Sequence, residues 1–183
     1  MPDGRDETIT CNDGHPLALT VFESDEPTDR VIVINSAMGV KRAFYRHYAA
    51  YLAAHGYHAI TYDYRGIGDS IQPDAPPAYL WQWGALDQTA IIAYALKTFP
   101  GATLSIVGHS VGGQIVGLTE HHPVVSRVLG IAAQSGHWRN WPGLRKLMML
   151  TLWYAAIPVT TTLFGSTGAR AGRRRECPQR RRP

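Results

Sequence analysis

The chain has 183 residues, of which 45% are apolar and 17% are charged, so it is long and hydrophobic enough to fold around one core. Its two cysteines, Cys11 and Cys177, are far apart and neither belongs to a Cys-x-x-Cys pair. These features exclude a disordered chain, a disulfide framework and a cysteine-based metal site. Free cysteines and a polar, acidic start without a secretory signal lead us to expect a cytoplasmic protein.

The formal net charge of +4 is distributed unevenly along the chain. Residues 166–183 contain seven arginines and one glutamate, a net charge of +6, whereas residues 1–165 contain eleven basic and thirteen acidic side chains, a net charge of −2. Residues 166–183 also lack any aliphatic side chain larger than alanine, which predicts a disordered basic tail. Because no basic stripe runs through residues 1–165, we expect no nucleic-acid partner.

Strands and helices alternate in the pattern of apolar residues. The predicted elements are a hairpin over 7–22, a strand over 31–34, a helix over 44–54, a strand over 57–62, a polar loop over 63–77, a helix over 79–99, a strand over 103–107, a helix over 114–120 and a strand over 127–133. The run over 31–34 is apolar on both faces, which is typical of a strand inside a parallel sheet. The sequence therefore predicts an α/β fold with a mostly parallel, doubly wound sheet.

Residues 147–164 form a run of 18 residues without a charged side chain, which is the length of a short membrane span. The run also contains four threonines and Pro158, so its mean hydropathy is modest. We expect an apolar, lid-like segment over 136–165, between a core over 1–135 and the tail over 166–183. A membrane-associated protein held by residues 147–164 is the alternative.

Gly108-His109-Ser110-Val111-Gly112 matches the pattern Gly-x-Ser-x-Gly between a predicted strand and a predicted helix. A sharp strand-to-helix turn exposes the central side chain above the sheet, and the N–H groups of the helix that follows favour negative charge there. We therefore predict Ser110 as a nucleophile. Gly108 and Gly112 are expected to be required because the backbone passes close to the turn.

A nucleophilic serine of this kind needs two backbone N–H groups that hold the negatively charged oxygen of the reacting carbonyl. The Val111 N–H, directly after the serine, is the first. The second is expected from the loop that follows the strand over 31–34, and we predict the Met38 N–H.

Three sequence blocks resemble the α/β-hydrolase family: Val31–Gly39, Asp63-Tyr-Arg-Gly-Ile-Gly-Asp-Ser70 and Val107–Gln114. They occur in the family's order, and the chain is most similar to predicted serine hydrolases related to the S33 serine aminopeptidases and monoacylglycerol lipases. The family's usual His-Gly-x-Gly loop is Ser36-Ala-Met-Gly39 here. The resemblance implies hydrolysis of an ester, thioester or amide through an acyl-enzyme on Ser110. This reaction needs no metal and no organic cofactor. The apolar segment after residue 143, with Trp138, Trp141 and Trp153 nearby, leads us to expect a small hydrophobic acyl substrate.

Other titratable residues near these motifs have structural interpretations. Asp63 and Arg65 are expected to stabilise a tight loop through hydrogen bonds between side chain and backbone, and Asp87 is expected to be solvated or to brace a loop. The adjacent His121 and His122 are expected to be exposed and to bind no metal.

The order nucleophile, acid, histidine is not completed in this sequence. After Ser110 there is no aspartate, and the remaining acids and histidines are Glu120, Glu176, His121, His122 and His137. His137 follows the last predicted strand and is the candidate base. We expect a fold that is truncated after its sixth strand and a tail that is a frameshift product, with a natural disordered basic tail as the alternative. The alternative to a serine hydrolase is a catalytically inactive fragment that lacks the acid and the histidine; the oligomeric state is not predicted.

Overall fold

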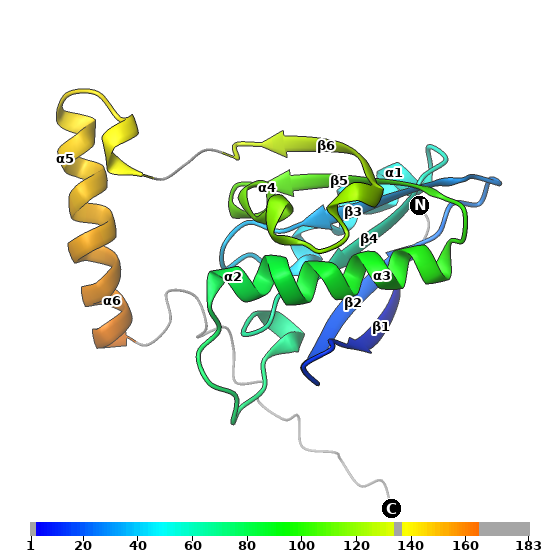
Figure 1. Ribbon diagram of the computed structural model, residues 1–183, viewed down its shortest axis with the longest axis horizontal. Helices are drawn as coiled ribbons and strands as arrows, with labels where there is room; N and C mark the ends of the chain where they lie inside the picture. Colours follow the sequence, from blue (N-terminus) through cyan, green and yellow to red (C-terminus); the bar gives the residue numbers. More distant parts are fainter. Residues whose placement is uncertain (1–2, 134–136, 165–183) are drawn as a thin grey trace, which may run out of the picture. The chain divides into compact units, whose positions relative to one another are not determined.

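The computed structural model describes residues 3–133 and 137–164 (Figure 1). The chain divides into two compact units, residues 1–135 and residues 136–183. The predicted basic tail and Cys177 lie outside the described residues.

A six-stranded sheet organises the first unit (Figure 1). Its strands are β1 Arg5–Thr10, β2 Pro16–Phe22, β3 Arg30–Asn35, β4 His58–Tyr62, β5 Thr103–His109 and β6 Val125–Ile131. They lie in the order β1-β2-β4-β3-β5-β6, with β1 and β2 antiparallel to their neighbours and the other four strands parallel. The predicted α/β class with a mostly parallel sheet is confirmed.

Both faces of the central strand are covered, as the apolar run over 31–34 predicts. Successive side chains point to opposite faces of a strand, so alternate residues join different hydrophobic clusters. Val31 and Val33 pack with the helix α3 Thr89–Thr98, whereas Ile32 and Ile34 pack with the helix α1 Arg46–Ala53. The sheet is therefore doubly wound around two cores, with α1 and α3 on opposite faces (Figure 1).

The helical elements of the first unit depart from the predicted ranges in two places. Besides α1 and α3, the helical elements of this unit are η1 Arg42–Tyr45, η2 Gly68–Ser70, α2 Leu80–Gln82, the π-helical η3 Trp83–Gln88, α4 Val111–Gln114, η4 Ile115–Leu118 and η5 His122–Val124. The predicted helix over 79–99 is interrupted by η3. The helix predicted over 114–120 instead begins at Val111 and ends at Leu118, because Thr119 is extended and its hydroxyl bonds to Thr89 over 2.9 Å.

The strand β6 is the outermost of the described strands on its side of the sheet. It pairs with β5 in parallel, and Val128, Leu129 and Ile131 are 51%, 54% and 45% exposed. Since alternate residues of a strand face opposite sides, both faces of β6 are solvent-accessible.

The second unit is helical. It contains η6 Trp138–Asn140, α5 Leu144–Thr151, the π-helical η7 Leu152–Ala156 and α6 Ile157–Phe164. Within the described ranges, no helix has both the length and the apolar character that crossing a membrane requires. A span over 147–164 is therefore not supported.

Candidate active site

Ser110 is the single residue between β5 and α4. Its φ of 53° and ψ of −117° lie in a region that is strained for a residue other than glycine. The Ser110 N–H donates to the Ile131 carbonyl oxygen over 2.8 Å, and the Ser110 carbonyl accepts the Gly113 N–H over 3.1 Å. The turn is thus held from β6 and from α4, while the side chain of Ser110 remains half-buried.

The two glycines of the motif lie where a side chain does not fit. A Cβ atom at Gly112 would lie 2.4 Å from the Asn35 carbonyl oxygen and 2.7 Å from that of Ser36. A Cβ atom at Gly108 would lie 2.5 Å from the Gly113 Cα atom. The close contact at Gly112 also shows that the loop after β3 lies against the first turn of α4.

One tyrosine connects the loop after β3 to the turn Gly108–Gly112, which we call the elbow. The Ala37 N–H donates to the Tyr45 hydroxyl oxygen over 2.9 Å, and that oxygen lies 2.9 Å from Nδ1 of His109. Burial raises the pKa of Tyr45, so the hydroxyl stays protonated. Because the Ala37 N–H is already bonded to Tyr45, the next N–H group along the loop is that of Met38. It bonds to no other described residue.

Removing the Tyr45 hydroxyl is expected to loosen this loop while the fold persists. In Tyr45→Phe the Ala37 N–H loses its acceptor, so the protein should lose about 1 kcal/mol of stability. Amide hydrogen exchange at Ala37 should accelerate. Urea unfolding and exchange measured by NMR check both effects, and Tyr48→Phe, at an exposed position of α1, serves as the control. Unchanged exchange at Ala37 would contradict the bridging role.

Sequence reasoning missed a set of buried polar side chains behind the elbow. Asn35, Tyr62 and Gln88 are fully buried and hydrogen-bonded to one another. Two sequence signals could have found them: an asparagine at the end of an otherwise apolar strand, and a glutamine on the apolar face of a helix. Their partners come from distant parts of the chain, which local periodicity does not reveal.

The loop after β4 has the structural role that its sequence predicts. Asp63 accepts the backbone N–H groups of Arg42 and Asp69 over 2.7 and 3.1 Å. Arg65 is an ion-pair donor: its Nε lies 2.7 Å from Asp87, and another guanidinium nitrogen lies 2.7 Å from Asp13. Burial acts to lower the pKa of Arg65, but the hydrogen bond to Asp13 and the charge of Asp87 outweigh it and raise that pKa.

Asp87 is not solvated: its exposure is 0%. Its carboxylate accepts both the backbone N–H and the guanidinium of Arg65, over 2.9 and 2.7 Å. The loop-bracing interpretation of Asp87 is therefore correct, and the solvated one is wrong.

The two remaining candidates for acid and base, Glu120 and His137, lie in different units of the chain. Glu120 lies beyond the end of η4, where its N–H donates to Thr89. His137 belongs to the second unit, where its Nδ1 accepts the Arg139 N–H over 3.3 Å, and its role as a base stays a prediction. Over the described residues, no three His, Cys, Asp or Glu side chains are arranged to hold a metal ion.

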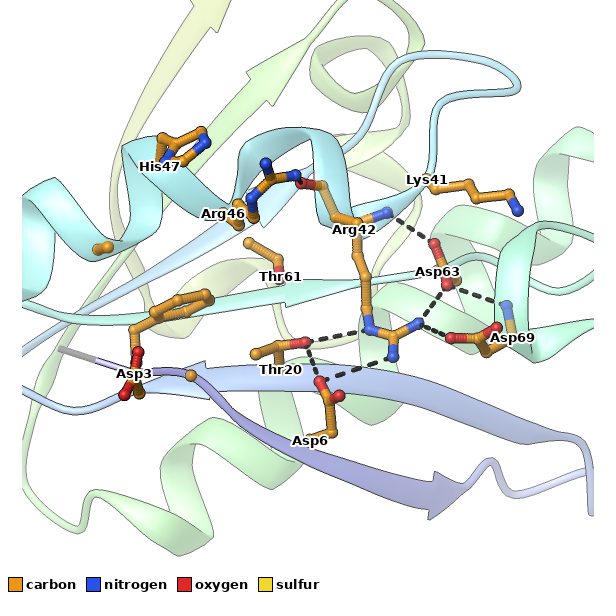
Figure 2. Close-up of a pocket in the computed structure, with 14 residues that line it drawn as sticks. Asp3, Asp6, Thr20, Lys41, Arg42, Arg46, His47, Thr61, Asp63 and Asp69 are labelled. Carbon is orange, nitrogen blue, oxygen red and sulfur yellow. Dashed lines mark hydrogen bonds and ion pairs between the residues drawn. The ribbon is translucent and has the colours of Figure 1, made fainter. Parts of the chain in front are cut away.

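A cavity of about 570 Å³ opens between the start of α1 and the strands β2 and β4 (Figure 2). Figure 2 shows the Arg42 guanidinium surrounded by Asp6, Asp63 and Asp69, whose oxygens lie 3.6, 2.5 and 2.8 Å from it. The lining of the cavity includes neither Ser110 nor the other residues predicted for catalysis. The cavity and the elbow are therefore separate features.

Comparison with protein families and curated proteins gives consistent results. Residues 26–173 match the model of the family described as serine aminopeptidase, S33. The chain is 28% identical over 126 residues to the monoacylglycerol lipase ABHD2 of Homo sapiens, and 27% identical to that of Mus musculus. The alignment covers 63% of this chain and 28% of the human lipase, so the chain spans less than a third of that relative's length.

Solved structures show the same fold at low sequence identity. A thermostable carboxyl esterase from Bacillus coagulans superposes with a TM-score of 0.63 at 14% identity, over 89% of this chain and 51% of the esterase. The Pyrococcus furiosus esterase Pf2001 superposes with a TM-score of 0.59 at 15% identity, over 82% of this chain and 60% of the esterase. Both matches concern the fold.

Proposed function

Because this chain belongs to the serine aminopeptidase S33 family of α/β-hydrolases, we propose that it carries a serine-hydrolase site with Ser110 as the nucleophile. The strained backbone of Ser110, between a parallel strand and the N-terminus of a helix, is the observation that carries the proposal. Such strain persists only where the surrounding structure maintains it, and it presents the hydroxyl at the edge of the sheet.

The proposed reaction is acyl transfer to water in two steps. The Ser110 oxygen attacks the carbonyl carbon of the substrate, and the carbonyl oxygen becomes negatively charged. The Val111 N–H, the first of α4, has no partner within the helix, and with the Met38 N–H it would hold that oxygen. The leaving group departs with a proton, and water then attacks the acyl-enzyme, releases the acid and restores Ser110.

The names of the similar proteins point to an ester as the bond that is hydrolysed. The curated relatives are called monoacylglycerol lipases, and two similar structures are called esterases. We propose a carboxylic ester with a small hydrophobic acyl group as the substrate.

The second candidate function is an inactive member of the family. It is favoured by the Ser110 hydroxyl, which forms no hydrogen bond to any side chain of the described residues. A serine hydroxyl without a base is a poor nucleophile.

Labelling with a fluorophosphonate separates the two candidates. An active site should label in the wild type, lose the label in Ser110→Ala, and keep it in Ser105→Ala, a matched change on the same strand. Hydrolysis of p-nitrophenyl esters should follow the same pattern. Absence of label from both the wild type and Ser110→Ala would refute the hydrolase and support the inactive candidate.

A further inference from the structure

A chain of hydrogen-bonded polar groups runs through the core behind the Ser110 elbow. The Tyr62 hydroxyl donates to Oδ1 of Asn35 over 2.8 Å. Nδ2 of Asn35 donates to Oε1 of Gln88 over 2.5 Å and to the Gly112 carbonyl oxygen over 2.9 Å. Nε2 of Gln88 donates to the Val116 carbonyl oxygen over 3.3 Å. Three side chains from β4, β3 and η3 thus converge on the backbone of α4 and η4.

These amides occupy places where apolar side chains would avoid the desolvation cost of a buried polar group. Asn35 and Gln88 are both 0% exposed, and the four residues before Asn35 are all apolar. Nδ2 of Asn35 and Nε2 of Gln88 donate to carbonyl oxygens of α4 and η4, which together we call the elbow helix. The network therefore fixes where that helix lies relative to β3.

We propose that Asn35 and Gln88 are positioning residues for the oxyanion site, an inference that rests on the proposed function of Ser110. Asn35 ends the strand that leads into the loop with Met38, and its side chain holds the carbonyl of the residue after Val111. One residue therefore controls the spacing of two N–H donors that belong to separate elements. Such donors stabilise an oxyanion only if they are fixed before the charge develops.

Two reactions of one thiol can separate donor positioning from folding. In a Ser110→Cys, Cys177→Ser background, the remaining native thiol is inert, because burial raises the pKa of Cys11 to about 12. The introduced thiolate attacks the carbonyl of p-nitrophenyl acetate, passes through a tetrahedral oxyanion and releases p-nitrophenolate. With iodoacetamide the same thiolate displaces iodide, and no oxyanion forms. The ratio of the two rate constants therefore measures oxyanion stabilisation.

Gln88→Met keeps the side-chain volume and removes the amide, and it should lower this ratio at least about tenfold. Tyr62→Phe removes one oxygen from the same network, so it should lower the ratio by about threefold, and it tests the inference even if Gln88→Met fails to fold. Thr89→Val is the matched control. It removes a buried hydroxyl that neighbours Gln88 and bonds to Thr119, and its ratio should stay within about twofold of the background.

An unchanged ratio in the folded network variants would overturn the inference. So would an equal fall in Thr89→Val, or alkylation that slows in step with acylation, because either result would mean that the network only maintains the fold. A wild type that takes no fluorophosphonate label would refute the proposed function instead. The ratio would still be measurable on the thiol variants, so the two failures are distinguishable.

Discussion

Gly112→Ala is expected to destabilise the protein by about 3 kcal/mol and to abolish the reactivity of Ser110. The added Cβ would lie 2.4 Å from the Asn35 carbonyl oxygen, 2.7 Å from the Asn35 carbonyl carbon and 2.7 Å from the Ser36 carbonyl oxygen. All three are backbone atoms, so none can rotate away. Either α4 or the loop after β3 must move, and the two proposed oxyanion donors move apart with them.

Gly117→Ala is the control for this prediction. No atom lies within 4 Å of a Cβ at Gly117, which is in η4 of the same helical segment. Alanine there should be neutral or should stabilise by up to about 1 kcal/mol, since it restricts the unfolded chain more than glycine does. Urea unfolding compares the two variants, and fluorophosphonate labelling reports on Ser110. Similar unfolding midpoints for both variants would contradict the steric argument.

Asp87→Ala is expected to cost about 3–4 kcal/mol of stability, because it leaves the Arg65 guanidinium buried with only part of its counter-charge. The Asp87 carboxylate is 0% exposed and accepts both the backbone N–H and Nε of Arg65. The same variant removes the acceptor that fixes the loop after β4.

Asp13→Ala is the matched change on the other side of Arg65. The side chain of Asp13 is 36% exposed, so water can replace it as a partner, and its loss should cost no more than about 1 kcal/mol. Urea unfolding at neutral pH measures both variants. If Asp87→Ala lowers the free energy of unfolding no more than Asp13→Ala does, the buried ion pair of Arg65 and Asp87 does not stabilise the loop.

Local patterns were sufficient for the sheet and for the turn at Ser110. The side chains of the apolar run over 31–34 belong to two hydrophobic clusters, and a strand with such a run needs helices on both faces. The glycines around Ser110 indicated a close backbone approach, and the structure shows its partner, Asn35, to be on a different strand. Sequence spacing predicts that a close approach exists, whereas the fold decides what is approached.

Other features depend on pairs of residues that are distant in the chain. Asn35 and Gln88 each look like a polar residue misplaced in an apolar element, and only their contact explains them. The elbow helix ends early because Thr119 bonds to Thr89, a contact that helical propensity does not include. Asp87 is buried because the loop that it braces folds over it. These interactions are tertiary, and periodicity along one element carries no information about them.

The pairing of β3 with β5 places the candidate site late in the order of folding. Asn35 is in register with Gly108, so about 70 residues of chain must close into a loop before this ladder forms. The hairpin of β1 and β2 and the parallel pair of β3 and β4 use contacts that are nearer in sequence. During synthesis, the loop with Met38 therefore emerges before β5, the strand that leads into Ser110, is available. The turn at Ser110 lies beside the loop with Met38 only once β5 pairs with β3, which links formation of the candidate site to completion of the central sheet.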